Sequence, residues 1–84
     1  MQTDLAMLPI GRRAAICALD AGDALTRRLF DLGFVPGCPI RCLFAAPSGD
    51  PRAYRVRGTV IALRQSDAAG IAVLPLREED AAWD

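Results

Sequence analysis

The sequence predicts a mainly β fold: a small barrel of about five short strands, with one α-helix between the first and second strands. Three observations predict this fold. Short segments with alternating apolar and polar residues recur along the chain, turn residues separate them about every 8–12 residues, and a single segment has helical periodicity. An open sheet would leave two exposed edges, which closure into a barrel removes.

The first elements are a strand and the helix. After an extended segment over residues 1–11, a strand is expected over residues 13–19. The helix is expected over residues 20–32, with Asp20 as its N-cap. Leucines spaced by four and three residues form one apolar stripe along it, at Leu25, Leu29 and Leu32.

The helix is expected to end at Gly33. Glycine readily adopts the left-handed backbone conformation that closes many helices, and Phe34 then folds back onto Leu29, as in a Schellman ending. Pro36 and Gly37 turn the chain away from the helix.

Two further strands follow the helix. A strand over residues 38–45 places three side chains on one face: Ile40, Cys42 and Phe44. Residues 47–51 are dense in turn residues and form a loop. In the next strand, over residues 54–57, the alternation of apolar and charged residues points Tyr54 and Val56 inward.

The last predicted elements are short. Gly58 marks a bend before a strand over residues 59–64. Ser66 is expected to cap one helical turn that extends through residue 69. The final strand is expected over residues 71–74.

The chain length of 84 residues corresponds to one domain. We expect this domain to cover residues 1–76, followed by a charged, flexible tail over residues 77–84. Trp83 lies in that tail, where it is either disordered or an anchor on a neighbouring molecule.

The composition argues against an enzyme. The chain has no histidine and no lysine, and ten arginines balance ten acidic residues, so the formal net charge is zero. A triad-type nucleophile needs an adjacent base, most often histidine, and histidine is also the commonest metal ligand. A neutral chain has no overall field that attracts nucleic acid. We therefore expect a binding protein with no required cofactor and no nucleic-acid partner.

The cysteine count and the apolar segments predict a cytoplasmic protein. Three cysteines, an odd number in so short a chain, argue against a disulfide framework. The first residues lack the basic and apolar regions of a secretory signal. Residues 14–19 are the longest apolar run, far shorter than the roughly 18 residues that a membrane span needs. We therefore expect no membrane insertion.

Six short motifs follow one another along the chain: Leu8–Gly11, Arg28–Gly37, Pro47–Pro51, Val56–Gly58, Ile61–Arg64 and Ala68–Val73. In this order they resemble the ferrous iron transport protein A family (FeoA). The resemblance covers about residues 5–74, nearly the whole domain. The stretch Arg28–Gly37 is its most specific part, and each of the other motifs is weak on its own.

The resemblance implies an SH3-like β-barrel and a cytosolic accessory role in bacterial ferrous iron uptake. It also implies a partner, the membrane permease ferrous iron transport protein B (FeoB), contacted through its cytosolic GTP-binding region. The same fold is similar to the C-terminal domain of iron-dependent repressors, so the alternative is a metal-sensing or metal-binding module. Weak homo-oligomerisation is also left open.

The exit of the helix is the candidate partner-binding surface. Apolar residues beside arginine are a common composition of protein interfaces. The predicted contact residues are Arg27, Arg28, Phe34, Val35 and Pro36. The alternative is that this segment only ends the helix and turns the chain.

Cys38 and Cys42 are weak candidates for metal ligands. On a strand, four residues span about 13 Å, so one metal ion cannot bind both thiolates, and a disulfide between them is excluded as well. We expect both to be buried apolar thiols. Zinc or iron held by one of them together with carboxylates of another chain would be adventitious.

Five arginines are expected on the outer wall of the barrel: Arg41, Arg52, Arg55, Arg57 and Arg64. The simplest interpretation is a solvated face, and the functional one is attraction to an acidic partner, which mainly raises the association rate. Binding of single-stranded nucleic acid would need exposed aromatic residues between the arginines. Tyr54, which is the nearby aromatic residue, is expected to point inward.

Overall fold

The computed structural model describes residues 2–20 and 22–77. Trp83 and the rest of the predicted tail beyond residue 77 lie outside the described residues, so the predicted boundary at residue 76 stays a prediction. The elements are, in chain order, β1 (Thr3–Asp4), the 3₁₀ helix η1 (Leu5–Met7), β2 (Arg13–Leu19), α1 (Asp23–Asp31), β3 (Pro39–Ala45), β4 (Arg52–Val56), β5 (Thr59–Leu63), α2 (Gln65–Ala68) and β6 (Ile71–Pro75).

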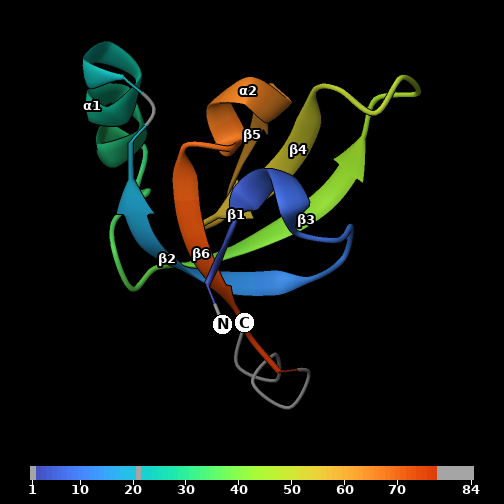
Figure 1. Cartoon of the computed structure of the whole chain (residues 1–84), viewed down its shortest axis with the longest axis horizontal. Helices are drawn as coiled ribbons and strands as arrows, with labels where there is room; N and C mark the ends of the chain where they lie inside the picture. Colours follow the sequence, from blue (N-terminus) through green and yellow to red (C-terminus); the bar gives the residue numbers. More distant parts are fainter. Residues whose placement is uncertain (1, 21, 78–84) are drawn as a thin grey trace.

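The strands form one curled antiparallel sheet, which confirms the mainly β class (Figure 1). Its order is β1-β6-β2-β3-β4-β5, so β1 and β5 are its two edges and the sheet does not close within the described residues. The predicted closed barrel of about five strands is therefore corrected to an open sheet of six. The helix α1 follows the second strand, not the first, because the segment over residues 1–11 contributes β1.

A two-residue turn joins β4 to β5. Arg57 and Gly58 form it, with φ angles of 51° and 79°. Two positive φ angles in succession are the mark of a type I′ turn, whose twist matches that of the flanking strands. The turn confirms the predicted bend at Gly58 and sets the register, in which Val56 lies opposite Thr59.

A β-bulge in β3 corrects the predicted position of Phe44. The pairing of β3 with β4 shifts between Cys42 and Phe44. An extra residue in one strand moves the following side chains to the other face. Ile40 and Cys42 therefore point into the core as predicted, whereas Phe44 is 60% exposed.

The start of α1 differs from the prediction. Its N-cap is Gly22, which has no side chain for capping, and not Asp20. The backbone of Asp20 instead continues the pairing of β2 with β6, because its N–H donates to the carbonyl of Gly70 over 2.6 Å. The strand therefore uses the residue that the sequence pattern assigned to the helix.

The short helix α2 also begins without a side-chain cap. Its N-cap is Arg64, so Ser66 lies inside the turn and is not the cap that was predicted. The N–H of Gln65 donates to Oδ1 of Asp50 over 2.9 Å, which ties α2 to the loop before β4. None of the described helices has the length and apolar character that crossing a membrane requires.

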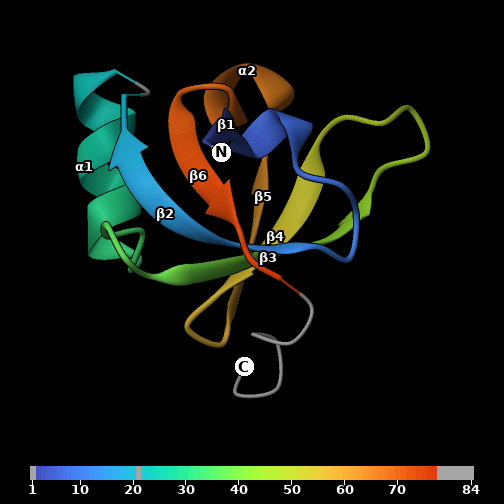
Figure 2. The same cartoon turned by 60° about the horizontal axis from the view of Figure 1, so that its bottom comes forward.

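Figure 2 shows how strongly the sheet curls, and the core side chains lie on its inner side. Tyr54 and Val56 are fully buried there, as predicted. Leu5 and Leu8 enter it from the N-terminal segment, and Leu29 enters it from α1. The helix thereby packs at one side of the sheet while the rest of its length stays at the surface (Figure 1).

Candidate functional site

A Schellman motif ends α1. The N–H of Phe34 donates to the carbonyl of Leu29 over 2.9 Å, and that of Gly33 donates to the carbonyl of Phe30 over 3.0 Å. Gly33 has a φ of +104°, the left-handed conformation that this ending needs. The predicted contact of Phe34 with the helix is thus made, and Phe34 has no exposed surface.

A groove of about 340 Å³ lies between α1, β5 and α2. A volume of this size is at the lower end of ligand pockets. Apolar side chains of α1 and β5 line opposite sides of the groove. Two arginines and one aspartate also line it. The lining residues are Leu25, Arg28, Leu29, Leu32, Pro51, Ile61, Ala62, Leu63, Arg64 and Asp67.

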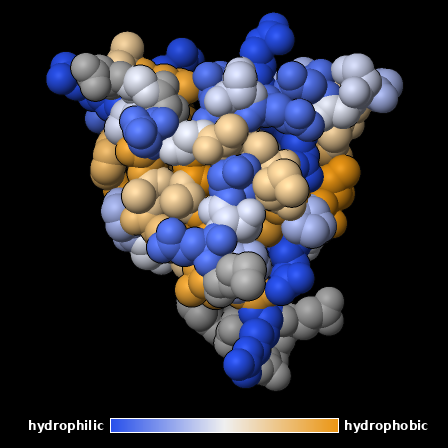
Figure 3. All heavy atoms as spheres, viewed as in Figure 1, coloured by the Kyte–Doolittle hydropathy of each residue, from blue (hydrophilic) through white to orange (hydrophobic). Residues whose placement is uncertain are grey.

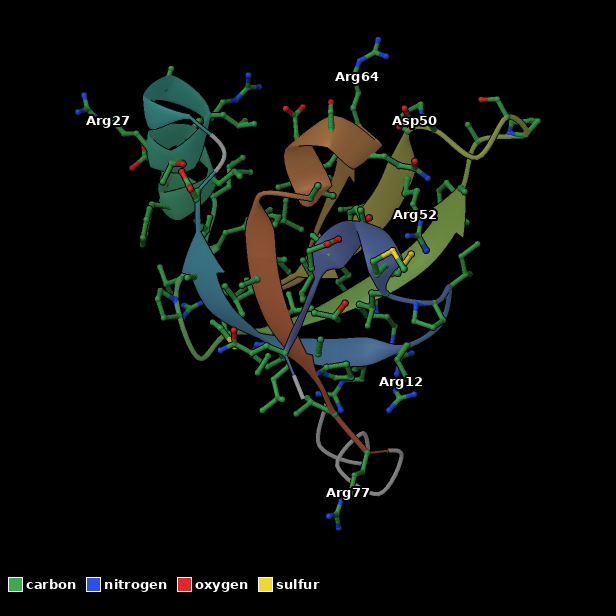
Figure 4. All side chains as sticks on the ribbon, in the orientation of Figure 1. Arg12, Arg27, Asp50, Arg52, Arg64 and Arg77 are labelled. Carbon is green, nitrogen blue, oxygen red and sulfur yellow. The ribbon has the colours of Figure 1, made fainter. Side chains whose placement is uncertain are left out.

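A second, shallower hollow lies on the other side of α1, with a volume of about 520 Å³. Arg27 and Phe30 line it together with the end of β2. Figure 4 shows Arg27 on the side of α1 that points away from the sheet. The two neighbouring arginines of α1, Arg27 and Arg28, therefore belong to different hollows.

The structure divides the predicted contact residues. Arg27, Arg28 and Pro36 are exposed, and Val35 is half-buried against the core. Phe34 is fully buried, so its predicted contact with a partner is corrected to a core position. The helix ending that the sequence pattern identified is what buries this ring.

The sequence pattern did not identify two exposed apolar residues, one in α1 and one at its C-cap. Leu32, assigned to the buried stripe, is 39% exposed and lines the groove. Phe30 is 43% exposed and lines the hollow on the other side. An apolar residue outside the stripe, as Phe30 is, was the signal for an unpartnered helix face. On the face seen in Figure 3, apolar side chains likewise interrupt a mostly polar surface.

Arg52 is not on the outer wall, where it was predicted. It is 8% exposed, and its guanidinium donates to the carbonyls of Ala6 and Leu8 over 2.7 and 2.6 Å. The side chain also lies over the ring of Tyr54, 5.9 Å from its centroid. Figure 4 shows Arg52 reaching from β4 toward the N-terminal segment. Arg52 therefore attaches η1 to the sheet, and its side chain is too buried to contact a partner protein.

The other wall arginines keep most of their predicted exposure. Arg55, Arg57 and Arg64 are exposed, and Arg41 is half-buried. The side chain of Arg57 packs against Gly33 at the end of α1. Its Nε donates to Sγ of Cys38 over 3.4 Å.

The cysteines are free thiols. Cys38 and Cys42 are buried, which confirms that expectation, and Cys17 is half-buried. Burial raises the pKa of the Cys42 thiol above its ordinary value of 9.0, while the neighbouring Arg52 opposes the rise. A metal ion would therefore have to displace a proton from this thiol. The described part of the chain contains no group of three or more cysteine, aspartate or glutamate side chains arranged to hold a metal ion.

The open sheet with its capping helix defines a small, mainly β domain of the SH3-like class. The sequence model of the FeoA domain matches residues 3–75. The chain therefore belongs to the FeoA family, as the order of its motifs predicts.

Three relatives document this membership. The Fe(2+) transport protein A/Fe(2+) transporter FeoB fusion protein of Porphyromonas gingivalis is 35% identical over 69 residues, which are 82% of this chain and 8% of that protein. The FeoA structure from Chlorobium tepidum is 37% identical with a TM-score of 0.86, over 89% of this chain and 71% of the other. The zinc complex of Stenotrophomonas maltophilia FeoA, described as an SH3 domain protein, is 37% identical with a TM-score of 0.73, over 84% and 88%.

The iron- and manganese-dependent repressors share the fold at a greater distance. A manganese-dependent transcriptional repressor superimposes with a TM-score of 0.77 over 89% of this chain at 16% identity. At that identity the likeness concerns the fold alone.

Proposed function

We propose that the chain acts in ferrous iron uptake by binding a FeoB-type membrane permease at the cytoplasmic face of the membrane, and that it does so without catalysing a reaction. One observation carries the proposal: in the relative from Porphyromonas gingivalis, the A protein and the FeoB transporter form a single polypeptide. Two proteins that are joined in one chain act at the same place. The cytosolic GTP-binding region of the permease is the proposed contact partner.

The groove between α1 and β5 is the proposed contact surface on this chain. Its mostly apolar lining, which also includes Arg28 and Arg64, has the composition of many protein interfaces. Leu32 offers exposed apolar surface next to Arg28. Binding to one state of the permease more tightly than to another would shift the population of its states, which is how a domain without catalytic groups changes transport.

The two neighbouring arginines of α1 give a matched test of this surface. We expect Arg28→Glu to weaken binding to the purified GTP-binding region by at least about tenfold, because it reverses a charge in the groove. Arg27→Glu makes the same change on the other side of the helix and should weaken binding by less than about threefold. Calorimetry in the GDP-bound and GTP-bound states of the permease region measures both.

Equal losses in the two variants would show that only the overall charge of α1 matters. Unchanged binding in both would remove the groove as the contact surface. If the wild-type chain binds the region in neither nucleotide state, the proposed partner is wrong. Both side chains are exposed, so unchanged melting temperatures serve as the control for folding.

We propose further that the chain needs no bound metal or other cofactor. The arrangement of its described residues supports this, since the two buried cysteines have no carboxylates gathered around them. Anaerobic calorimetric titration of the monomer with Fe²⁺ is expected to give no saturable heat. Stoichiometric binding in the micromolar range would favour the alternative function, a metal-sensing or metal-binding module.

A further inference from the structure

The two edge strands of the sheet, β1 and β5, differ in how well they are protected against pairing with another chain. β1 has two residues, one of them Asp4. β5 has five, Thr-Val-Ile-Ala-Leu, without a charge or a proline. Natural proteins usually block edge strands with shortness, charge, proline or a bulge, because an open edge pairs with other chains. β5 has none of these features, and Val60, its second residue, is 54% exposed.

The hairpin determines which backbone groups of β5 are free to pair. A two-residue type I′ turn makes its flanking residues, Val56 and Thr59, a hydrogen-bonded pair. In an antiparallel ladder such pairs alternate, so Ile61 also directs its N–H and C=O toward β4. Val60 and Ala62 direct theirs to the other side, where no strand of the described chain pairs with β5.

This free edge borders the groove. Ala62 lines the groove from β5, and Leu25 of α1 and its C-cap Leu32 line it from the opposite wall. A segment that pairs with β5 would thus place side chains against apolar surface. The charged residues that line the groove are two arginines, Arg28 and Arg64, and one aspartate, Asp67. The lining therefore carries an excess of positive charge.

We propose that the edge of β5 pairs with an extended segment of a partner protein, which lies in the groove beside α1 as an added strand. The segment is apolar at alternate positions and has acidic residues at its ends. Backbone hydrogen bonds to Val60 and Ala62 align the segment with β5, and its acidic ends form ion pairs with Arg28 and Arg64. The inference rests on the proposed function only for the identity of the partner.

A second copy of this chain fits the edge poorly. Antiparallel pairing of β5 with itself around Ile61 would place Arg64 of one copy beside the turn that contains Arg57 of the other. Arginines would then meet at both ends of the strand pair, and like charges across a strand pair are destabilising. An acidic segment replaces this repulsion with attraction.

A synthetic peptide tests the edge directly. The probe is acetyl-Asp-Glu-Val-Thr-Val-Thr-Val-Glu-Asp-amide, titrated into the isotope-labelled chain and followed by NMR. At saturation, exchange of the amide hydrogens of Val60 and Ala62 should slow by at least about tenfold. The amide of Ile61, which is already bonded to β4, should change little.

Matched variants separate backbone pairing from simple contact. Ala62→Pro removes the outward N–H and should weaken peptide binding at least about tenfold, whereas Ala62→Val keeps the N–H and should bind as the wild type does. A peptide N-methylated at its central valine lacks an N–H that would donate to a carbonyl of β5, so it tests the pairing from the peptide side without changing the protein. A peptide with lysine for every acid tests the charge. Both should bind at least about tenfold more weakly.

Several outcomes would overturn the inference: no protection of Val60 and Ala62 in excess peptide, or equal binding of the N-methylated peptide. A concentration-dependent dimer that Ala62→Pro abolishes would show that the edge serves a second copy instead. If the peptide binds and the permease region does not, the proposed partner is wrong, whereas the proposed strand pairing at β5 is supported. If the permease region binds Ala62→Pro and wild type equally, the edge is not its docking site.

Discussion

Replacing Phe34 with alanine is expected to lower the free energy of unfolding by about 3–5 kcal/mol. The ring is fully buried among core residues, and the Schellman motif at the end of α1 fixes its position. Its removal leaves a cavity between the helix and the sheet. The loss is a large fraction of the roughly 5–15 kcal/mol that stabilises a folded domain. Urea denaturation followed by circular dichroism measures it.

Phe30 provides the matched control for this experiment. It lies on the same helix but is 43% exposed, so Phe30→Ala should cost only about 1 kcal/mol. If Phe34→Ala instead left stability unchanged and abolished binding to the permease region, the role predicted from the sequence, a direct contact, would be right after all.

Replacing Arg52 with methionine is expected to cost about 2–4 kcal/mol. The change removes two hydrogen bonds from a charged donor, each worth roughly 1.5–3 kcal/mol, and leaves the carbonyls of Ala6 and Leu8 without this partner. Relief from burying a charge offsets part of the loss. Local release of η1 should also speed exchange of the Leu8 amide hydrogen, which is bonded to Leu5. Urea denaturation and hydrogen exchange measure the two effects.

Arg55→Met is the control on the same strand. Its side chain is exposed, so the stability should change by no more than about 0.5 kcal/mol. Arg52→Lys is expected to recover only part of the stability, because one ammonium group does not reproduce the guanidinium fork. Equal effects of Arg52→Met and Arg55→Met would contradict the assignment of Arg52 as the group that holds η1.

Local patterns predicted the ends of elements where one residue type has a specific conformational role. Gly33 and Gly58 were both located correctly, because a left-handed backbone conformation favours glycine. Alternation likewise identified Tyr54 and Val56 as core residues. The helix α1 followed from its leucine stripe, although Leu32 at its end lines the groove.

Features that depend on distant parts of the chain could not be predicted in this way. The bulge that exposes Phe44 is a property of the pairing of β3 with β4, and no residue type in β3 predicts it. The burial of Arg52 depends on two carbonyls more than forty positions away in the sequence. The short strand β1 exists only because β6 offers it a partner. The groove itself needs α1, β5 and α2 in one place.

The pairing of β1 with β6 has a consequence for how this domain is attached to other proteins. Thr3 lies opposite Val73, so β1 near the start of the described chain runs beside β6, its last strand (Figure 1). α2, which borders the groove, precedes β6 in the chain. The strand β6 then leads away from α2 toward Pro75. A tether that leaves the described chain before Thr3 or after Pro75 would therefore start away from the groove. It would also supply the tethered partner at a high effective concentration, about millimolar for a short flexible linker, so that even a weak docking contact would be occupied.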